Sequence, residues 1–300
     1  MTIINLFGAN NPAGAAFLEL ARKKTIKTWG RRAVPAQTDN HIYCNLSELP
    51  PVNLRPIKGV LVSFAPIWLL APFLKEIATS QPEILQDLMG IIACSSSSFV
   101  TKRFAFSQHD RNLVFRLTEA HNSLAQTCGA LKIPLQVLAP TLVYGAIGNF
   151  QDKNISKIIR IMRCTPAVVL PTYSGMRQPI HASQLAAVAM YQSDKMFSKQ
   201  WTSTELLVLS LGGDDVFSYE DMLVKIKENL ASNDPARRCK IIRVPDRLFY
   251  FCASPLLVLD PKLFESVIRV SSNLSGFTRV CDIIREEPQG FPILPLPVVS

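Results

Sequence analysis

Residues 8–14 form a glycine-containing turn of the kind that can bind phosphate groups. The sequence there is Gly-Ala-Asn-Asn-Pro-Ala-Gly, between an apolar run and a helical pattern. Gly8 permits a tight turn, Gly14 permits close packing of helix on strand, and the helix N-terminus offers amide groups to a pyrophosphate. Asn11 replaces the middle glycine and brings a side chain toward the phosphates. Gly8, Asn10, Asn11 and Gly14 are therefore candidate dinucleotide ligands, although an ordinary strand-to-helix connection has the same pattern.

A basic segment accompanies the second predicted strand. Residues 22–32 include six Lys or Arg residues and no acid. Nucleotide-binding folds place an acid here for a ribose 2′-hydroxyl, or a base for a 2′-phosphate. Arg31 and Arg32 therefore predict NADP as the cofactor, with NAD as the alternative. The basic residues at 22–24 have a second explanation, because cations stabilise the C-terminal end of a helix.

Composition excludes several other kinds of site. The seven cysteines form no Cys-x-x-Cys pair and the four histidines have no metal-ligand spacing, so we expect reduced thiols and no metal. The net charge of +9, from 32 Lys+Arg against 23 Asp+Glu, attracts anions of every kind. No nucleic-acid motif is present and the basic residues do not alternate with aromatic ones, so a nucleic-acid partner is not expected.

Strand and helix patterns alternate through the first half of the chain. Strands are predicted at residues 2–7, 25–29, 59–64, 90–94 and 135–138. Helices are predicted at residues 13–24, 72–80, 82–89 and 112–131. The run at 59–64 is apolar throughout, as in a strand buried on both faces. This alternation predicts an α/β fold with a doubly wound parallel sheet of Rossmann type.

The texture changes after residue 145, where basic and apolar positions alternate. We predict a dinucleotide-binding domain at residues 1–150, rejoined by about 174–211, and a smaller C-terminal α/β lobe at residues 151–300. A strand is expected at 206–211, and a helix at 218–230 with Ser218 as its cap. The apolar stretches at 59–74 and 248–259 are too short for a membrane span, and no charged leader begins the chain. A cytoplasmic location is therefore expected.

Several motifs match a known family in order and spacing. They are the turn at 8–14, the serines at 95–98, Pro-Thr-Leu-Val-Tyr-Gly at 140–145, Asn154, and Gly-Met-Arg-Gln-Pro-Ile-His at 175–181. Together they resemble the extended short-chain dehydrogenase/reductases, in particular the NAD-dependent epimerase/dehydratase family. The resemblance implies a Rossmann fold, a bound dinucleotide, and a nucleotide sugar or related small molecule as substrate. The oligomeric state is left open, with a homodimer as one alternative.

The same resemblance implies positions for the ligands. Asn45 and Leu46 would lie near the adenine, and Ala65 and Pro66 would line the path to the nicotinamide. Asn154 and Arg177 would then contact a phosphate of the substrate, with a simple surface arginine as the alternative explanation of Arg177.

The proton-transfer residues of that family are missing. Its members carry a Tyr-x-x-x-Lys dyad on the long helix, after a Ser or Thr at the end of the preceding strand. Alignment on residues 118–120 puts Arg111 and Phe115 at the two dyad positions. No tyrosine occurs between Tyr43 and Tyr144, so a shifted register does not restore the dyad.

Replacement groups lie nearby in the sequence. Ser95 and Ser96 retain the serine position, and His109 is a candidate substitute proton donor, with an exposed loop histidine as the alternative explanation. Tyr144 is a further candidate, although its place in the Val-Tyr-Gly turn favours a packing role.

Two functions therefore remain open. The first is an atypical family member that binds NADP and acts on a nucleotide sugar with a displaced acid/base group. The second is a non-catalytic NADP-binding sensor or scaffold, which the missing dyad favours. The apolar segment 248–257 is either a docking or membrane-surface face, or a buried helix of the C-terminal lobe.

Overall fold

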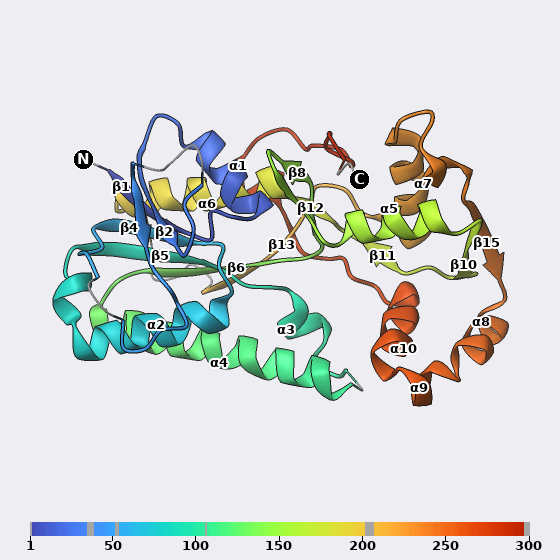
Figure 1. The fold of residues 1–300 in the computed structure, drawn as a ribbon, viewed down its shortest axis with the longest axis horizontal. Helices are drawn as coiled ribbons and strands as arrows, with labels where there is room; N and C mark the ends of the chain where they lie inside the picture. The colour runs from blue at the N-terminus through green and yellow to red at the C-terminus, as the bar shows by residue number, and fades with distance from the viewer. Residues whose placement is uncertain (1, 35–38, 52–53, 106, 202–206, 297–300) are drawn as a thin grey trace.

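An eight-stranded parallel sheet forms the centre of the larger lobe (Figure 1). The computed structural model describes residues 2–34, 39–51, 54–105, 107–201 and 207–296. The strand order is β16-β13-β6-β5-β4-β1-β2-β3. The bounds are β1 Ile3–Phe7, β2 Thr25–Gly30, β3 His41–Tyr43, β4 Gly59–Ser63, β5 Leu88–Cys94, β6 Leu135–Pro140, β13 Val208–Gly212 and β16 Thr278–Arg279. The predicted Rossmann-type fold is confirmed.

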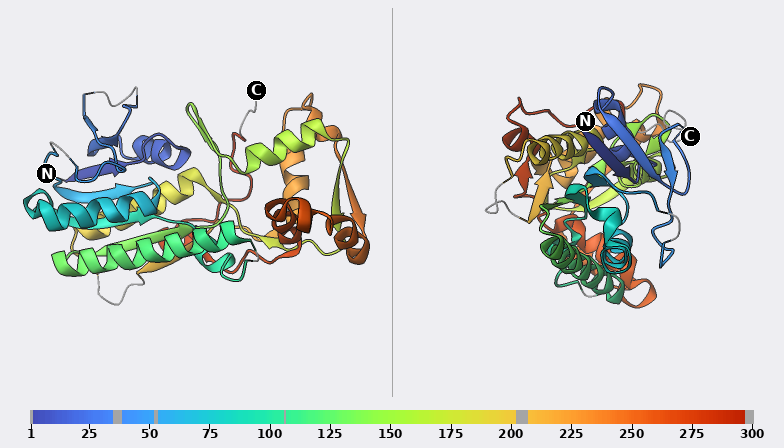
Figure 2. Two further views of the ribbon diagram at one scale, coloured as in Figure 1. Left: turned by 60° about the horizontal axis from the view of Figure 1, so that its bottom comes forward. Right: turned by 90° about the vertical axis from the view of Figure 1, so that its left-hand side faces the viewer.

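Helices cover both faces of this sheet. One face carries α1 (Pro12–Leu20), α6 (Ala182–Phe197) and α11 (Val280–Ile284), and the other carries α2 (Ile67–Ser80) and α4 (Gln108–Leu131) (Figures 1 and 2). Strand β4 supplies both cores, since Val60 and Val62 pack with α1 and α6 while Leu61 packs with α2 and α4. The apolar run therefore marks a strand buried on both faces.

Two helix predictions differ from the structure in instructive ways. Helix α2 begins at Ile67, not at residue 72, because Pro72 lies inside the helix instead of starting it. The helix expected at 82–89 is only the short turn η2 (Pro82–Leu85), since Leu88 pairs with Gly59 as the first residue of β5. The short helix α3 (Ser98–Thr101) follows β5.

The smaller lobe has its own core. Helices α5 (Ile155–Cys164) and α7 (Tyr219–Asn229) pack beside the parallel pair β10 (Ala167–Pro171) and β15 (Lys240–Val244), with the turn η3 (Pro235–Arg238) between α7 and β15. Short strand pairs connect the lobes: β7 (Val143–Tyr144) with β12 (Ile180–His181), β8 (Ala146–Ile147) with β9 (Phe150–Gln151), and β11 (Met176–Arg177) with β14 (Phe217–Ser218). The chain then returns to the sheet in β16 and α11, a crossing the sequence did not predict.

Three further helices lie at the far end of the smaller lobe (Figure 1). They are α8 (Asp246–Ala253), α9 (Leu256–Leu259) and α10 (Pro261–Ile268), followed by the turn η4 (Arg269–Ser271). Among the described helices, none is long and apolar enough to span a membrane.

Candidate functional site

The carboxyl ends of the central strands meet at a topological switch point. Strand β1 lies between β2 and β4 in the sheet. From β1 the chain first adds β2 and β3 on one side, and then crosses over to add β4 and β5 on the other side. Open α/β sheets bind ligands in the crevice outside the carboxyl ends of the strands at such a point. The glycine-containing turn between β1 and α1 lies here.

Both glycines of this turn are required by the backbone around them. Gly8 has φ +76°, and a Cβ there would lie 2.4 Å from the Ala65 amide nitrogen. A Cβ on Gly14 would lie 2.2 Å from the Gly8 carbonyl oxygen. The turn is therefore closed against both β1 and the segment after β4, as dinucleotide-binding turns are.

Asn11 does not direct its side chain at a ligand, contrary to the expectation from the sequence. Its Oδ1 accepts a hydrogen bond of 2.9 Å from the Gly14 amide, and its Nδ2 donates one of 3.0 Å to the Phe64 carbonyl. Asn11 is the N-cap of α1, with extended backbone angles. The side chain therefore stabilises the helix start and joins the turn to the end of β4.

The start of α1 has fewer free amides than a typical anion-binding helix. Pro12 has no N–H, and the Gly14 amide is bonded to Asn11. Of the four amides that a helix N-terminus leaves without an intrahelical partner, those of Asn11 and Ala13 remain. A pyrophosphate at this helix would therefore need further donors from elsewhere in the chain.

A cavity of about 470 Å³ lies beside this helix start, and we call it the turn cavity. Its walls include Asn10 to Ala13, Phe64, Cys94, Leu185 and residues 149–154. The β8–β9 hairpin packs against α1 and so brings Lys153 and Asn154 to this cavity. Asn154 also donates a 2.9 Å hydrogen bond to the Val143 carbonyl. Lys153 is the cation among the residues that line the cavity.

A second cavity, of about 320 Å³, lies on the β2 side of the turn, and we call it the β2 cavity. It brings together residues from four separate segments: Gly8, Asn10, Asn11, Trp29, Gly30, Arg31, Cys44, Asn45, Leu46, Ser47, Ala65 and Pro66. The positions that the sequence assigned to adenine and to the nicotinamide path thus share one cavity. Ser47 and Asn45 form a local turn, with the Ser47 amide 3.2 Å from Asn45 Oδ1.

Arg31 and Arg32 lie with Asn10 around an adjoining hollow of about 490 Å³. Asn10 Nδ2 donates a 3.1 Å hydrogen bond to the Arg32 carbonyl, which ties the β2 end to the glycine-containing turn. Both arginine side chains are exposed. The arrangement presents two guanidinium groups to an anion next to the β2 cavity.

Ser95, at the end of β5, contacts a histidine that the sequence interpretation overlooked. Ser95 Oγ lies 2.7 Å from His121 Nε2, and the Phe99 ring packs edge-on against the imidazole with centroids 5.0 Å apart. Burial lowers the pKa of His121, so the imidazole is neutral. The available signal was its spacing: His121 lies four residues after Leu117 and three before Leu124, on the face of α4 that packs against the sheet.

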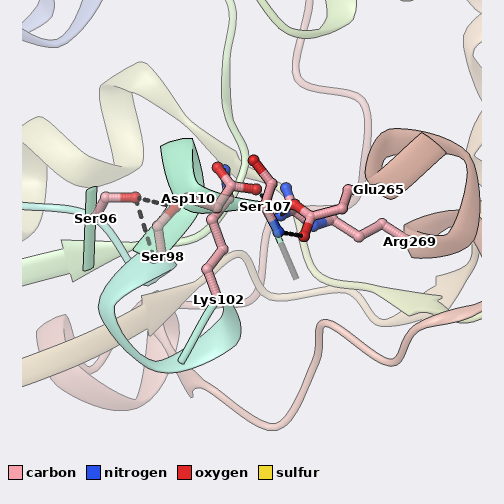
Figure 3. A network of polar contacts seen from close by, with 7 residues as sticks. All are labelled: Ser96, Ser98, Lys102, Ser107, Asp110, Glu265 and Arg269. Carbon is pink, nitrogen blue, oxygen red and sulfur yellow. Dashed lines mark hydrogen bonds and ion pairs between the residues drawn. The ribbon is translucent and has the colours of Figure 1, made fainter. Parts of the chain in front are cut away.

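The other proposed replacements lie elsewhere. Ser96 Oγ donates a 3.0 Å hydrogen bond to Ser98 Oγ (Figure 3), so it supports the start of α3. His109 is exposed in the first turn of α4. Arg111 and Phe115 are exposed as well, and Phe115 keeps 65% of its surface accessible. Neither lies on the face of α4 that meets Ser95.

A polar network next to this region joins the two lobes (Figure 3). Asp110 forms an ion pair of 2.8 Å with Lys102 and a second ion pair with Arg269. Arg269 also pairs with Glu265 at 3.2 Å. The Ser107 amide donates to Glu265. Burial opposes ionisation of Asp110, but hydrogen bonds with Glu265, Lys102 and Arg269 hold its pKa below the usual range.

Arg177 has a structural role in place of the phosphate contact expected from the sequence. It is buried, and its Nη1 and Nη2 atoms donate to the carbonyls of Met176, Ser272, Arg269 and Val270. Its guanidinium also stacks on the Tyr219 ring, 5.0 Å from the centroid. These bonds fix η4 to β11 and leave no terminal N–H pair for a ligand.

Tyr144 is likewise a packing residue. Its ring is buried between His181 and Phe291, and its hydroxyl accepts a 3.0 Å hydrogen bond from the Ile293 amide. Burial raises the pKa of the phenol. No group of three or more His, Cys, Asp or Glu residues in the described part of the chain is placed to hold a metal ion.

Neither protein-family models nor curated proteins match the sequence. Solved structures match the fold. A nucleoside-diphosphate-sugar epimerase from Staphylococcus aureus aligns over 97% of this chain and 98% of its own, at TM-score 0.59 and 12% identity. The fold is that of nucleotide-sugar epimerases.

Two further structures of the epimerase fold hold different cofactors. UDP-glucuronic acid 4-epimerase from Bacillus cereus, in complex with NAD, has TM-score 0.55 and 12% identity over 94% of this chain and 96% of its own. GDP-mannoheptose C4 reductase from Campylobacter jejuni, with NADP bound, has TM-score 0.53 and 11% identity over 81% of this chain and 87% of its own. Identities this low establish the shared epimerase fold alone.

Proposed function

We propose that this chain binds a nicotinamide dinucleotide, NADP in preference to NAD, across the β2 cavity and the turn cavity. The observation that carries the proposal is the convergence of the glycine turn, residues 45–46, residues 65–66 and the two arginines on adjoining hollows at the switch point. The tight Gly8 turn supports close approach of the ligand to the backbone. Arg31 and Arg32 would meet the 2′-phosphate, with charge-assisted hydrogen bonds.

The pyrophosphate would lie at the start of α1. There the amides of Asn11 and Ala13 are supplemented by Lys153, whose charge replaces the donor that Pro12 lacks. Asn154 lines the same cavity and remains a candidate contact to the substrate. Solved structures that hold NAD or NADP share the overall fold, which supports the proposal.

The reaction we propose is an epimerase-type or reductase-type conversion of a nucleotide sugar or a related small molecule. When bound, the nicotinamide supplies hydride transfer. Ser95 Oγ would take the proton of a substrate hydroxyl and pass its own to His121 Nε2, whose neutral form burial favours. This pair replaces the Tyr-x-x-x-Lys dyad, which we propose to be absent.

A turnover assay tests the reaction. Purified protein with NADP or NAD is supplied with a panel of nucleotide sugars, and both nicotinamide absorbance and epimerised product are followed. Ser95→Ala and His121→Gln should each lower kcat about 10²-fold or more, while His109→Gln leaves it unchanged. Turnover that is insensitive to both Ser95→Ala and His121→Gln would contradict the proposed proton path.

A non-catalytic sensor or scaffold is the second candidate. The two residues at the dyad positions favour the non-catalytic function. Arg111 and Phe115 are exposed, and neither carries the phenol or the amine of the dyad. Dinucleotide binding without turnover on any nucleotide sugar of the panel would favour this function over the enzyme.

A further inference from the structure

The far end of the smaller lobe turns its large apolar side chains outward. Val258 is 84% exposed, Leu259 79% and Phe251 76%. We call the following set the α8–α10 apolar surface: Leu248, Phe251, Leu257, Val258, Leu259 and Leu263. All six lie within 16 consecutive residues, on three helices of which α10 contacts both α8 and α9. Exposed apolar side chains this concentrated mark an interaction surface.

Polar contacts hold the inner side of these helices, together with buried Ala253 and partly buried residues such as Phe249 and Leu256. The Tyr250 hydroxyl donates a 2.6 Å hydrogen bond to Ser271 Oγ, and the Asp246 carboxylate accepts from the Tyr173 amide. Asp260 caps α10 by accepting a 3.0 Å bond from the Leu263 amide, and buried Glu265 pairs with Arg269. The helices are thus anchored to the lobe while the six residues of the α8–α10 apolar surface remain outside.

The chain that leads into α8 is basic. Residues 237–247 hold five basic residues and one acid, Asp246. The five are all exposed: Arg237, Arg238, Lys240, Arg243 and Arg247. Of these, Lys240 and Arg243 lie on β15, which runs along the edge of the lobe to the start of α8 (Figure 1), and Arg247 lies in α8 itself. Arg243 pairs with Glu220 at 2.6 Å. The other four basic residues still outnumber the one acid of this segment, so the chain that leads to Leu248 and Phe251 carries a net positive charge.

We propose that the α8–α10 apolar surface binds the surface of an anionic lipid membrane. Leucine, phenylalanine and valine side chains next to arginine are the composition of helices that lie in the plane of the lipid interface. The headgroups would meet Arg247 while Phe251 and Val258 enter the acyl boundary. A second copy of this chain fits less well, because its own basic strand would face the same charge.

Vesicle sedimentation of the full-length protein is the experiment. The protein is incubated with vesicles of phosphatidylcholine alone, and with vesicles in which about one quarter of the lipid is phosphatidylglycerol. We expect it to pellet with the anionic vesicles, and binding to fall as salt is raised to about 1 M. Phe251→Trp should add a fluorescence component that shifts to shorter wavelength when anionic vesicles are added. Absence of pelleting by folded wild-type protein on anionic vesicles would overturn the proposal.

Matched variants separate the apolar contribution to vesicle binding from the electrostatic one. Phe251→Ser with Val258→Ser should weaken binding at least ten-fold, since burial of each side chain is removed. Arg247→Gln should weaken binding about five-fold on anionic vesicles only. Phe115→Ser, at an exposed apolar residue on α4, is the control and should leave binding to both kinds of vesicle unchanged. Thermal melting confirms that each variant is folded. A membrane role would be contradicted if the Phe251/Val258 double variant bound vesicles as well as the wild type does. It would also be contradicted if the wild type did not pellet with vesicles but self-associated, and the double variant abolished that self-association.

Discussion

Gly14 offers the sharpest test of the turn at the scale of one residue. A Cβ there would lie 2.2 Å from the Gly8 carbonyl oxygen, so either the helix or the turn must move. Gly14→Ala should lower the free energy of unfolding by about 1–3 kcal/mol and weaken dinucleotide binding at least ten-fold. Chemical denaturation and titration calorimetry measure the two effects.

Gly129 provides the matched control. It lies inside α4 with no atom within 4 Å of the position of an added Cβ. Gly129→Ala should raise stability by about 0.5–1 kcal/mol, because alanine loses less backbone entropy in a helix, and should leave binding unchanged. Equal effects of the two substitutions would mean that Gly14 is not constrained by close packing.

Lys153 is the second residue whose role follows from its neighbours. Pro12 removes one pyrophosphate donor, and Lys153 reaches the same cavity from the β8–β9 hairpin. Lys153→Met should weaken NADP binding about three- to ten-fold, with the loss shrinking at high salt. Lys157→Met, an exposed position on α5, is the comparison, and an equal loss in both variants would show a general charge effect instead of a contact.

Helix α6 begins at a buried histidine, and this makes the stability of the fold depend on pH. His181 caps α6 through Nδ1 and is 2% exposed, and burial lowers its pKa from 6.5 to about 4. The unfolded chain binds this proton more readily than the folded one. Stability is therefore complete above about pH 6.5 and falls as the pH drops toward 4, by about 3 kcal/mol.

The substitution His181→Asn keeps a capping side chain without a titrating group. Denaturation series between pH 4 and pH 7 should show a smaller loss of stability in this variant than in the wild type. Some loss remains because the pKa of His121 is lowered by burial too. An unchanged slope would mean that His181 titrates in the folded protein as it does in the unfolded chain.

The sequence predicted those elements whose patterns are local. Apolar runs gave strands such as β4, and Ser218 was expected to cap α7, as it does with its hydroxyl 3.0 Å from the Asp221 amide. Strand β16 was missed because Thr278–Arg279 is two exposed residues with no pattern, paired only through the tertiary fold.

The candidate site was only partly predictable for the same reason. Adjacency in sequence located the turn and the two arginines. His121 lies 26 positions from Ser95, and their contact depends on how α4 packs on the sheet. Arg177 matched a family motif, yet its surroundings of backbone carbonyls became visible only in three dimensions.

At the scale of the whole molecule, Asp110 joins the two lobes. It is 5% exposed and pairs with Lys102 of its own lobe and Arg269 of the other. Asp110→Asn should lower the free energy of unfolding by about 3 kcal/mol, because partly buried Lys102 loses its counter-charge and Arg269 keeps only that of Glu265. Denaturant titration provides the number.

The exposed pair Lys58–Asp87, at 2.7 Å, is the control for this effect. Asp87→Asn should cost less than about 1 kcal/mol, since both side chains are 55% exposed and solvent screens the pair. Losses of similar size in the two variants would mean that the Asp110 network contributes no more than a surface ion pair.

Cofactor preference tests the central claim most directly. Titration calorimetry of wild-type protein with NADP and with NAD should give at least ten-fold tighter binding of NADP, about 1.5–3 kcal/mol, through Arg31 and Arg32. The double variant Arg31→Ala and Arg32→Ala should bind the two dinucleotides equally, while Arg160→Ala on α5 keeps the preference. The assignment of the β2 cavity and the adjoining hollow to NADP would be contradicted if neither dinucleotide bound at millimolar concentration. A preference for NADP that survives the double substitution would contradict it as well.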